Sequence, residues 1–153
     1  MYSYASYLQP NEYTYVDMHE EIPAEKKEDV SDYLLTITGK SDSDYISKRL
    51  PVSDLHYEPN VQKGYYTYNY MYATVTNNTE DTIFGLTVLL VLLDEDDNIL
   101  YMDDVDLSDS TGIMPGNQMQ FKLDVNSYFI DYFSKHNIDP THVDAIAYVN
   151  ISQ

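Results

Sequence analysis

The run from Asp94 to Asn98 is where residue types and spacing come closest to metal chemistry. Asp94, Asp96 and Asn98 reproduce the first three ligand positions of an EF-hand loop, in which alternate oxygens converge on calcium. The match ends there, because Ile99 stands where the sharp turn needs glycine and Val105 stands where a bidentate glutamate is required. We therefore expect a hairpin turn here and no metal site.

More carboxylates follow this turn along the chain, with no basic residue between Asp94 and Asp109. Such a cluster is typical of a solvated acidic edge, which discourages strand-to-strand aggregation, and weak calcium binding is the alternative. We call the following residues the acidic patch: Asp94, Asp96, Asp97, Asp103, Asp104 and Asp106.

Catalytic chemistry has no support in the remaining residues. The four histidines, His19, His56, His136 and His142, include no pair with the spacing of a zinc site on a helix or hairpin. No Gly-x-Ser-x-Gly nucleophile elbow occurs, and the five glycines are too scattered for a phosphate-binding loop. With twenty-six acids in the chain, close carboxylate pairs arise without catalytic purpose. We predict a protein without catalytic residues, metal or cofactor.

Tyrosine is the residue type whose spacing is most suggestive of function. Tyr66, Tyr68, Tyr70 and Tyr72, which we call the tyrosine ladder, alternate along the chain, so a strand places all four on one sheet face. Tyrosine gives large, rigid contact area with a hydrogen-bonding tip, and recognition surfaces favour it. The ladder is either a binding face or a second core covered by the N-terminal arm. The arm contributes the tyrosines Tyr2, Tyr4, Tyr7, Tyr13 and Tyr15.

The ladder belongs to the first of several expected strands after Gly64. Its other face carries Met71, Ala73 and Val75, which suit a sandwich interior. The remaining strands are expected at 82–93, 99–107, 119–123 and 142–151, and a helix is expected near 126–137. Short strands in succession with one late helix predict an antiparallel β-sandwich. We expect the core to include Val75, Val88, Leu90, Leu92, Phe121, Phe129, Phe133 and Val149.

The first part of the chain has weaker patterns. We expect residues 1–60 to form an N-terminal extension, with a tyrosine-rich arm and either a short helix near 24–37 or a strand ending at Ile37. Residues 40–63 read as connections with at most one helical turn near Ile46. The sandwich domain is then expected over 61–153.

Composition narrows the classes of partner. The formal charge is -18, and residues 64–153 hold fourteen acids against only Lys122 and Lys135. This field repels nucleic acids and anionic lipids and attracts basic protein surfaces. The longest apolar run, Leu86 to Leu93, is far shorter than the roughly 20 residues of a membrane-spanning helix. The N-terminus has no signal-peptide pattern. We therefore expect a cytoplasmic protein, or a secreted or cell-envelope protein whose export signal is absent from this chain.

One stretch of the chain resembles a known domain family. Three segments carry the likeness: 72–79, then 86–100, then Pro115-Gly116 before Phe121. Together they resemble the bacterial FxLYD domain over about residues 64–151. The Phe-x-Leu-Tyr-Asp signature corresponds here to Leu90-Val91-Leu92-Leu93-Asp94, in which leucine replaces both aromatic residues. The resemblance implies an immunoglobulin-like sandwich, found mostly in exported proteins and lipoproteins, without a known catalytic activity.

Two functions follow as hypotheses. The first is a non-catalytic interaction module of a bacterial cell-envelope or secreted protein, which binds a protein or cell-surface ligand, a basic protein included. The second is an acidic inhibitor that imitates nucleic acid, such as a phage anti-CRISPR or antirestriction protein, whose carboxylates stand in for phosphates. Neither hypothesis requires nucleic-acid binding or membrane insertion.

Overall fold

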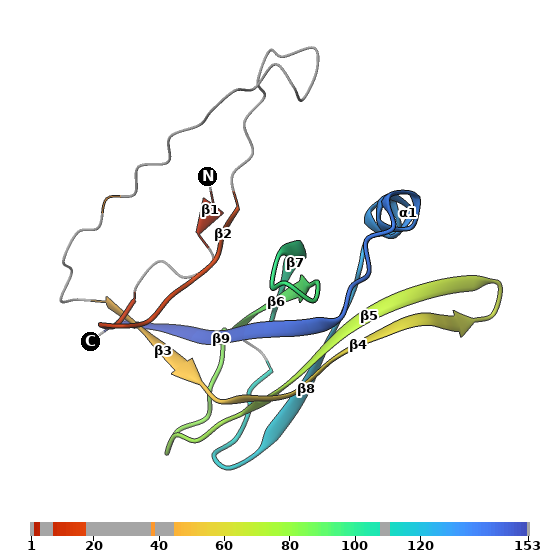
Figure 1. Cartoon of the computed structure of the whole chain (residues 1–153). Coiled ribbons are helices and arrows are strands. Elements are labelled where there is room, and N and C mark those ends of the chain that lie inside the picture. Colours follow the sequence, from red (N-terminus) through yellow and green to blue (C-terminus); the bar gives the residue numbers. More distant parts are fainter. Residues whose placement is uncertain (1, 4–7, 18–37, 39–44, 108–110, 153) are drawn as a thin grey trace.

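The computed structural model describes residues 2–3, 8–17, 38, 45–107 and 111–152, which form a β-sandwich with one helix among the described elements (Figure 1). The all-β prediction is confirmed. The strands are β1 (Tyr2–Ser3), β2 (Val16–Asp17), β3 (Tyr45–Leu50), β4 (Val52–Lys63), β5 (Tyr66–Thr76), β6 (Thr87–Leu93), β7 (Ile99–Asp106), β8 (Gln118–Asp124) and β9 (His142–Ser152), and the helix is α1 (Ser127–His136).

The strands form two antiparallel layers. The larger sheet has the order β3-β9-β6-β7, and the smaller sheet has the order β4-β5-β8. The short strands β1 and β2 pair with each other in a separate two-stranded ladder. Because β6 and β9 are central in the larger sheet, and β5 is central in the smaller one, these three strands contribute most of the buried side chains.

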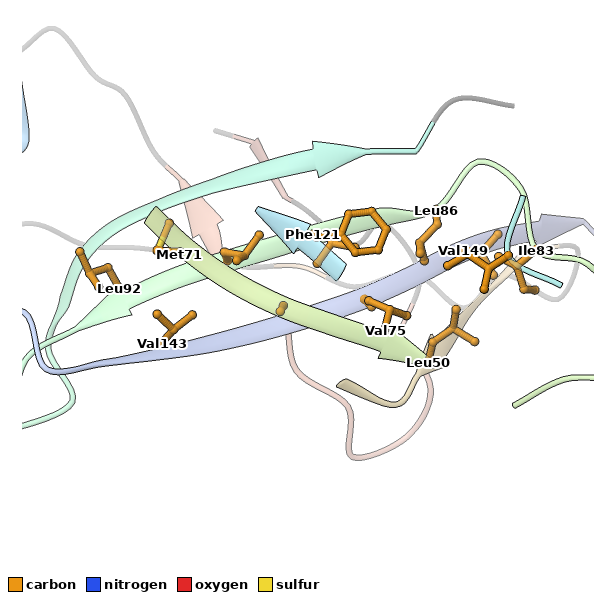
Figure 2. Close-up of a cluster of buried hydrophobic side chains, with 14 of the residues drawn as sticks. Leu50, Met71, Val75, Ile83, Leu86, Leu92, Phe121, Val143 and Val149 are labelled. Atoms are coloured by element: carbon orange, nitrogen blue, oxygen red, sulfur yellow. The ribbon is translucent and has the colours of Figure 1, made fainter. Parts of the chain in front are cut away.

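The core lies between the two layers. Figure 2 shows apolar side chains from both sheets in one cluster, Met71 and Val75 of β5 and Leu92 of β6 among them. Alternation along β5 places Ala73 on the same inner face, as expected, and the structure buries it completely. The predicted core is confirmed except for Phe129, which is 37% exposed and contacts the rings of Tyr101 and Phe133 at the margin of the core.

The apolar run of β6 is explained by burial on both of its faces. Val88, Leu90 and Leu92 face the sandwich core, whereas Leu89 and Val91 face outward and are also fully buried. A second cluster covers this outer face of the larger sheet. It consists of Leu89, Val91, Leu93, Ile146 and Tyr148, with Tyr15 and Met102 packed against it. Strands covered on both faces are expected to read as continuous apolar runs.

The sandwich begins earlier in the chain than the sequence indicated. Residues 45–60, expected to lie in the N-terminal extension, form β3 and most of β4, and Ile46 lies in a strand rather than a helical turn. Pro59 and Asn60 suggested a connection, yet β4 is an edge strand that tolerates proline. A register shift between Glu58 and Val61 accommodates them. The segment 24–37, expected to hold a helix or strand, lies outside the described residues.

Helix α1 has the ends that its sequence predicts. Asn126 caps its N-terminus, where its side-chain oxygen accepts a hydrogen bond from the Tyr128 N–H at 2.9 Å. Asn137 ends the helix in the left-handed conformation, at φ 53°. The carbonyl of Phe133 accepts the N–H of Ile138 at 3.0 Å, and the Phe133 ring enters the sandwich core.

Candidate binding surface

The hairpin of β4 and β5 projects beyond the rest of its sheet. β5 pairs with β8 only from Tyr70 to Thr76, whereas its pairing with β4 continues to the Lys63–Tyr66 pair. The far half of the hairpin is therefore a two-stranded ribbon, and Figure 1 shows it extending past β8. Gly64 closes the turn with φ 65°, a conformation that glycine adopts without steric cost.

The structure brings all four residues of the tyrosine ladder together on the outer face of this sheet. Each ring contacts the next, with centroid distances of 6.5 Å (Tyr66–Tyr68), 5.6 Å (Tyr68–Tyr70) and 6.0 Å (Tyr70–Tyr72). The rings of Tyr68 and Tyr70 are nearly parallel, at 7°. Tyr66 at the hairpin tip is 69% exposed and Tyr70 is only 6% exposed, while Tyr68 and Tyr72 are half-buried. The exposed part of the ladder is therefore its tip.

Two lysines cover the buried ring of Tyr70, and the sequence interpretation missed both. The Nζ atoms of Lys63 and Lys122 lie 4.7 Å and 4.5 Å from the Tyr70 centroid. Hydrogen bonding to Tyr70 raises the pKa of the Lys63 ammonium, so this group stays charged at neutral pH. The strand register was the missing information, since it places Lys122 directly opposite Tyr72 and beside Tyr70.

Tyr72, at the other end of the ladder, has its own partners on β4. Its ring stacks on the imidazole of His56, with centroids 4.5 Å apart and planes 9° from parallel. Its hydroxyl donates to Glu58 Oε2 at 2.9 Å. Partial burial raises the pKa of the Tyr72 hydroxyl, and the hydrogen bond to Glu58 raises it further. Tyr72 is therefore held in place by its own sheet, unlike Tyr66.

The described part of the N-terminal arm lies against the other sheet. Both Tyr13 and Tyr15 donate their hydroxyls to Asp144 Oδ2 of β9, at 3.2 Å and 2.6 Å. Tyr15 also packs in the outer cluster of the larger sheet. The interpretation in which these two tyrosines cover the ladder is therefore wrong. Tyr4 and Tyr7 lie outside the described residues, and β1 places the backbone of Tyr2 beside Asp17.

The acidic patch is divided between two places. Asp94, Asp96 and Asp97 form the turn between β6 and β7, where the Asp94 carboxylate accepts backbone N–H groups of Asp96 and Asn98, each at 2.9 Å. Hydrogen bonds from Asn98 lower the pKa of Asp94. The hydrogen bonds of this carboxylate therefore lie within its own turn. The expected hairpin turn is confirmed. Asp97 adopts φ 61° and contacts His142 Nε2 at 2.9 Å.

The other half of the acidic patch lies on β7, an edge strand of the larger sheet. Asp103 and Asp106 are exposed, while Asp104 is half-buried. Burial raises the pKa of Asp104, and the charges of Asp106 and Asp103 raise it further. Carboxylates along an unpaired edge repel a second strand, as expected for an acidic edge.

The three histidines that the structure describes, His56, His136 and His142, lie apart from one another and have separate partners. His142 contacts Asp97, whereas the ring of His136 lies 4.2 Å from that of Tyr132 on α1. Over the described ranges, no three or more His, Cys, Asp or Glu side chains are grouped so that they could hold a metal ion. His19 lies outside those ranges.

Helix α1 adds a second exposed aromatic surface. Tyr128 is 71% exposed, and Phe129 and Tyr132 are also open to solvent. The expected core included Phe129 and Phe133, but the short helix buries only Phe133, with Ile130 partly buried against the core.

Comparison with protein-family models, with curated proteins and with solved structures found no match. In the parts of the chain that the structure describes, no helix has the length and apolar character to span a membrane. The fold therefore defines a structural class: an all-β sandwich with a projecting, tyrosine-rich hairpin.

Proposed function

We propose that this protein is a non-catalytic binding module of a bacterial cell-envelope or secreted protein, and that the projecting β4–β5 hairpin is its contact surface. One observation carries the proposal: the exposed end of the tyrosine ladder lies on a ribbon that extends beyond β8. Tyr65 and Tyr66 at this tip are largely or fully exposed. Exposed aromatic side chains on a projecting element are typical of recognition surfaces.

The immunoglobulin-like character of the domain, and its relation to FxLYD, form part of this proposal. The division into four and three strands supports it, because a constant-type immunoglobulin sandwich has the same division. The order of the strands differs. Numbered from β3 onward, the sheets read 1-7-4-5 and 2-3-6, whereas the immunoglobulin order is 1-2-5-4 and 3-6-7.

A competing function, imitation of nucleic acid by an acidic inhibitor, rests on the carboxylates of β7. Asp103 and Asp106 are exposed on one edge strand, and the chain carries a formal charge of -18. A partner held by these groups binds through screened charge, so its affinity falls steeply with salt. A partner held by tyrosine contacts depends much less on salt.

Partner capture with two sets of variants tests the proposal. The double variant Tyr66→Ser and Tyr68→Ser should lose capture of its partner from bacterial extract at both low and high salt, with an unchanged melting temperature. The control is Tyr128→Ser, which removes an equally exposed tyrosine from α1 and should capture normally. Capture that survives the ladder variant, but is lost in high salt and after Asp103→Asn and Asp106→Asn, would instead support the acidic inhibitor.

A further inference from the structure

Two cations meet on the ladder from opposite edges of its sheet. Lys63 ends β4 and Lys122 lies in β8, and these strands flank β5 on its two sides. Their Nζ atoms approach the same ring, that of Tyr70, to 4.7 Å and 4.5 Å. Attraction to the ring quadrupole holds each ammonium there, but it does not neutralise their mutual repulsion.

No carboxylate of the described chain forms an ion pair with either ammonium; the pairs found are those of Arg49 with Glu12 and His142 with Asp97. The acidic residues paired with the ladder strand near these lysines already accept other hydrogen bonds. Glu58 accepts the Tyr72 hydroxyl, and Asp124 accepts the Asn69 N–H at 3.4 Å. In a chain with twenty-six acids and eight basic residues, two adjacent ammoniums without a carboxylate are exceptional.

From this arrangement we infer that Lys63 and Lys122 bind an aspartate or glutamate side chain of a partner protein. This inference rests on the proposed function and specifies which chemical group of the partner the binding surface contacts. A carboxylate placed between the two ammoniums relieves their repulsion and gains charge-assisted hydrogen bonds. Tyr66 and Tyr68 lie alongside and supply aromatic contact for the residues that flank the acid.

The charge of the whole chain favours a single acidic side chain over a polyanion. A nucleic acid or sulfated polysaccharide presents many charges and requires an extended row of cations. This face offers only Lys63 and Lys122 among the described residues, on a chain whose formal charge is -18. The long-range field repels a polyanion, whereas one carboxylate is attracted locally at contact distance.

Binding of a short peptide with one glutamate flanked by tyrosines, measured by fluorescence anisotropy at low salt, tests this inference on the full chain. We expect the double variant Lys63→Met and Lys122→Met to bind at least about tenfold more weakly, the loss of one charge-assisted interaction. Methionine keeps an apolar stem over Tyr70, and an unchanged melting temperature confirms folding. The control Lys135→Met removes a lysine of α1 and should bind as the wild type does.

Other outcomes separate this inference from the proposed function. Equal affinity for the same peptide with glutamine in place of glutamate, or tighter binding of a heparin oligosaccharide, overturns the carboxylate assignment. Undiminished peptide binding by the lysine double variant overturns it as well. If partner capture depends on Tyr66 and Tyr68 while the lysine variants have no effect, the binding module stands and only this inference fails.

Discussion

Asn77 is a buried polar residue that satisfies its own hydrogen bonds and those of three neighbours. Its Nδ2 group donates to the carbonyls of Asp81 and Ile113, at 2.8 Å and 2.7 Å. Its Oδ1 atom accepts the N–H of Thr79 at 2.9 Å. One side chain thus joins the loop after β5 to the segment before β8, and buried amides of this kind must be fully paired.

Replacing Asn77 by alanine removes these three hydrogen bonds and leaves the Thr79 N–H without its acceptor. The carbonyls of Ile113 and Asp81 keep the Ile83 N–H and the Thr79 hydroxyl as donors. We expect the free energy of unfolding, measured by urea denaturation, to fall by about 3 kcal/mol. The exposed neighbour Asn78 is the matched control, and Asn78→Ala should change stability by less than about 0.5 kcal/mol. Equal effects of the two substitutions would show that the hydrogen bonds of Asn77 contribute little.

Tyr15 makes the stability of the protein sensitive to alkaline pH. Burial raises the pKa of its hydroxyl above the ordinary value of 10.0, and the hydrogen bond to Asp144 raises it further. The unfolded chain therefore loses this proton first as the pH rises above 10, so the stabilisation is complete below that pH and declines above it. Tyr15→Phe should flatten the decline of unfolding free energy above pH 10. Tyr128→Phe controls for removal of one phenol, and an equal slope in both variants would contradict this account.

At the scale of elements, the N-terminal segment acts as a cover for the larger sheet. Arg49 of β3 donates a hydrogen bond to the carbonyl of Tyr13 and lies 3.9 Å from Glu12, which fixes the segment beside β3. Tyr15 then reaches the outer cluster that contains Leu89 and Val91. A strand with both faces apolar requires such a cover, because an exposed apolar sheet face promotes aggregation.

Deleting residues 1–18 should lower the melting temperature and increase binding of a hydrophobic dye, because Leu89, Val91 and Ile146 become exposed. Truncating Tyr15 alone to alanine should have a smaller effect in the same direction. The deletion should leave the tyrosine ladder unchanged, since the tyrosines of the described arm lie on the other sheet. Loss of peptide binding on deletion, with the melting temperature unchanged, would instead place the arm at the ladder.

For the molecule as a whole, the excess of acid opposes compaction. The formal charge is -18, and exposed carboxylates such as Asp103 and Asp106 lie on one edge. Raising NaCl from about 0.01 M to about 0.15 M shortens the screening length from about 30 Å to about 8 Å. We expect the melting temperature to rise by about 2–4 °C, which corresponds to roughly 1 kcal/mol. Asp103→Asn with Asp106→Asn should reduce this rise, and a melting temperature independent of salt would exclude the effect.

The sequence alone determined the class of fold and much of the core. Alternation of Met71, Ala73 and Val75 is a local pattern, so it reveals a strand and its inner face without knowledge of the partner strands. The helix expected near 126–137 rests on equally local signals, because its caps, Asn126 and Asn137 in the structure, act through neighbouring backbone groups. The turn after Leu93 was predictable for the same reason.

Only the tertiary structure decided which side chains meet across strands and layers. The approach of Lys63 and Lys122 to Tyr70 depends on strand order and register, which no local pattern encodes. The same holds for β4, whose proline and bulge resemble a connection until its pairing with β5 is known. The position of Tyr15 also depends on the tertiary structure. Tyr15 packs where the outer face of the larger sheet is apolar and must be buried, and the tyrosine pattern of the arm does not indicate that face.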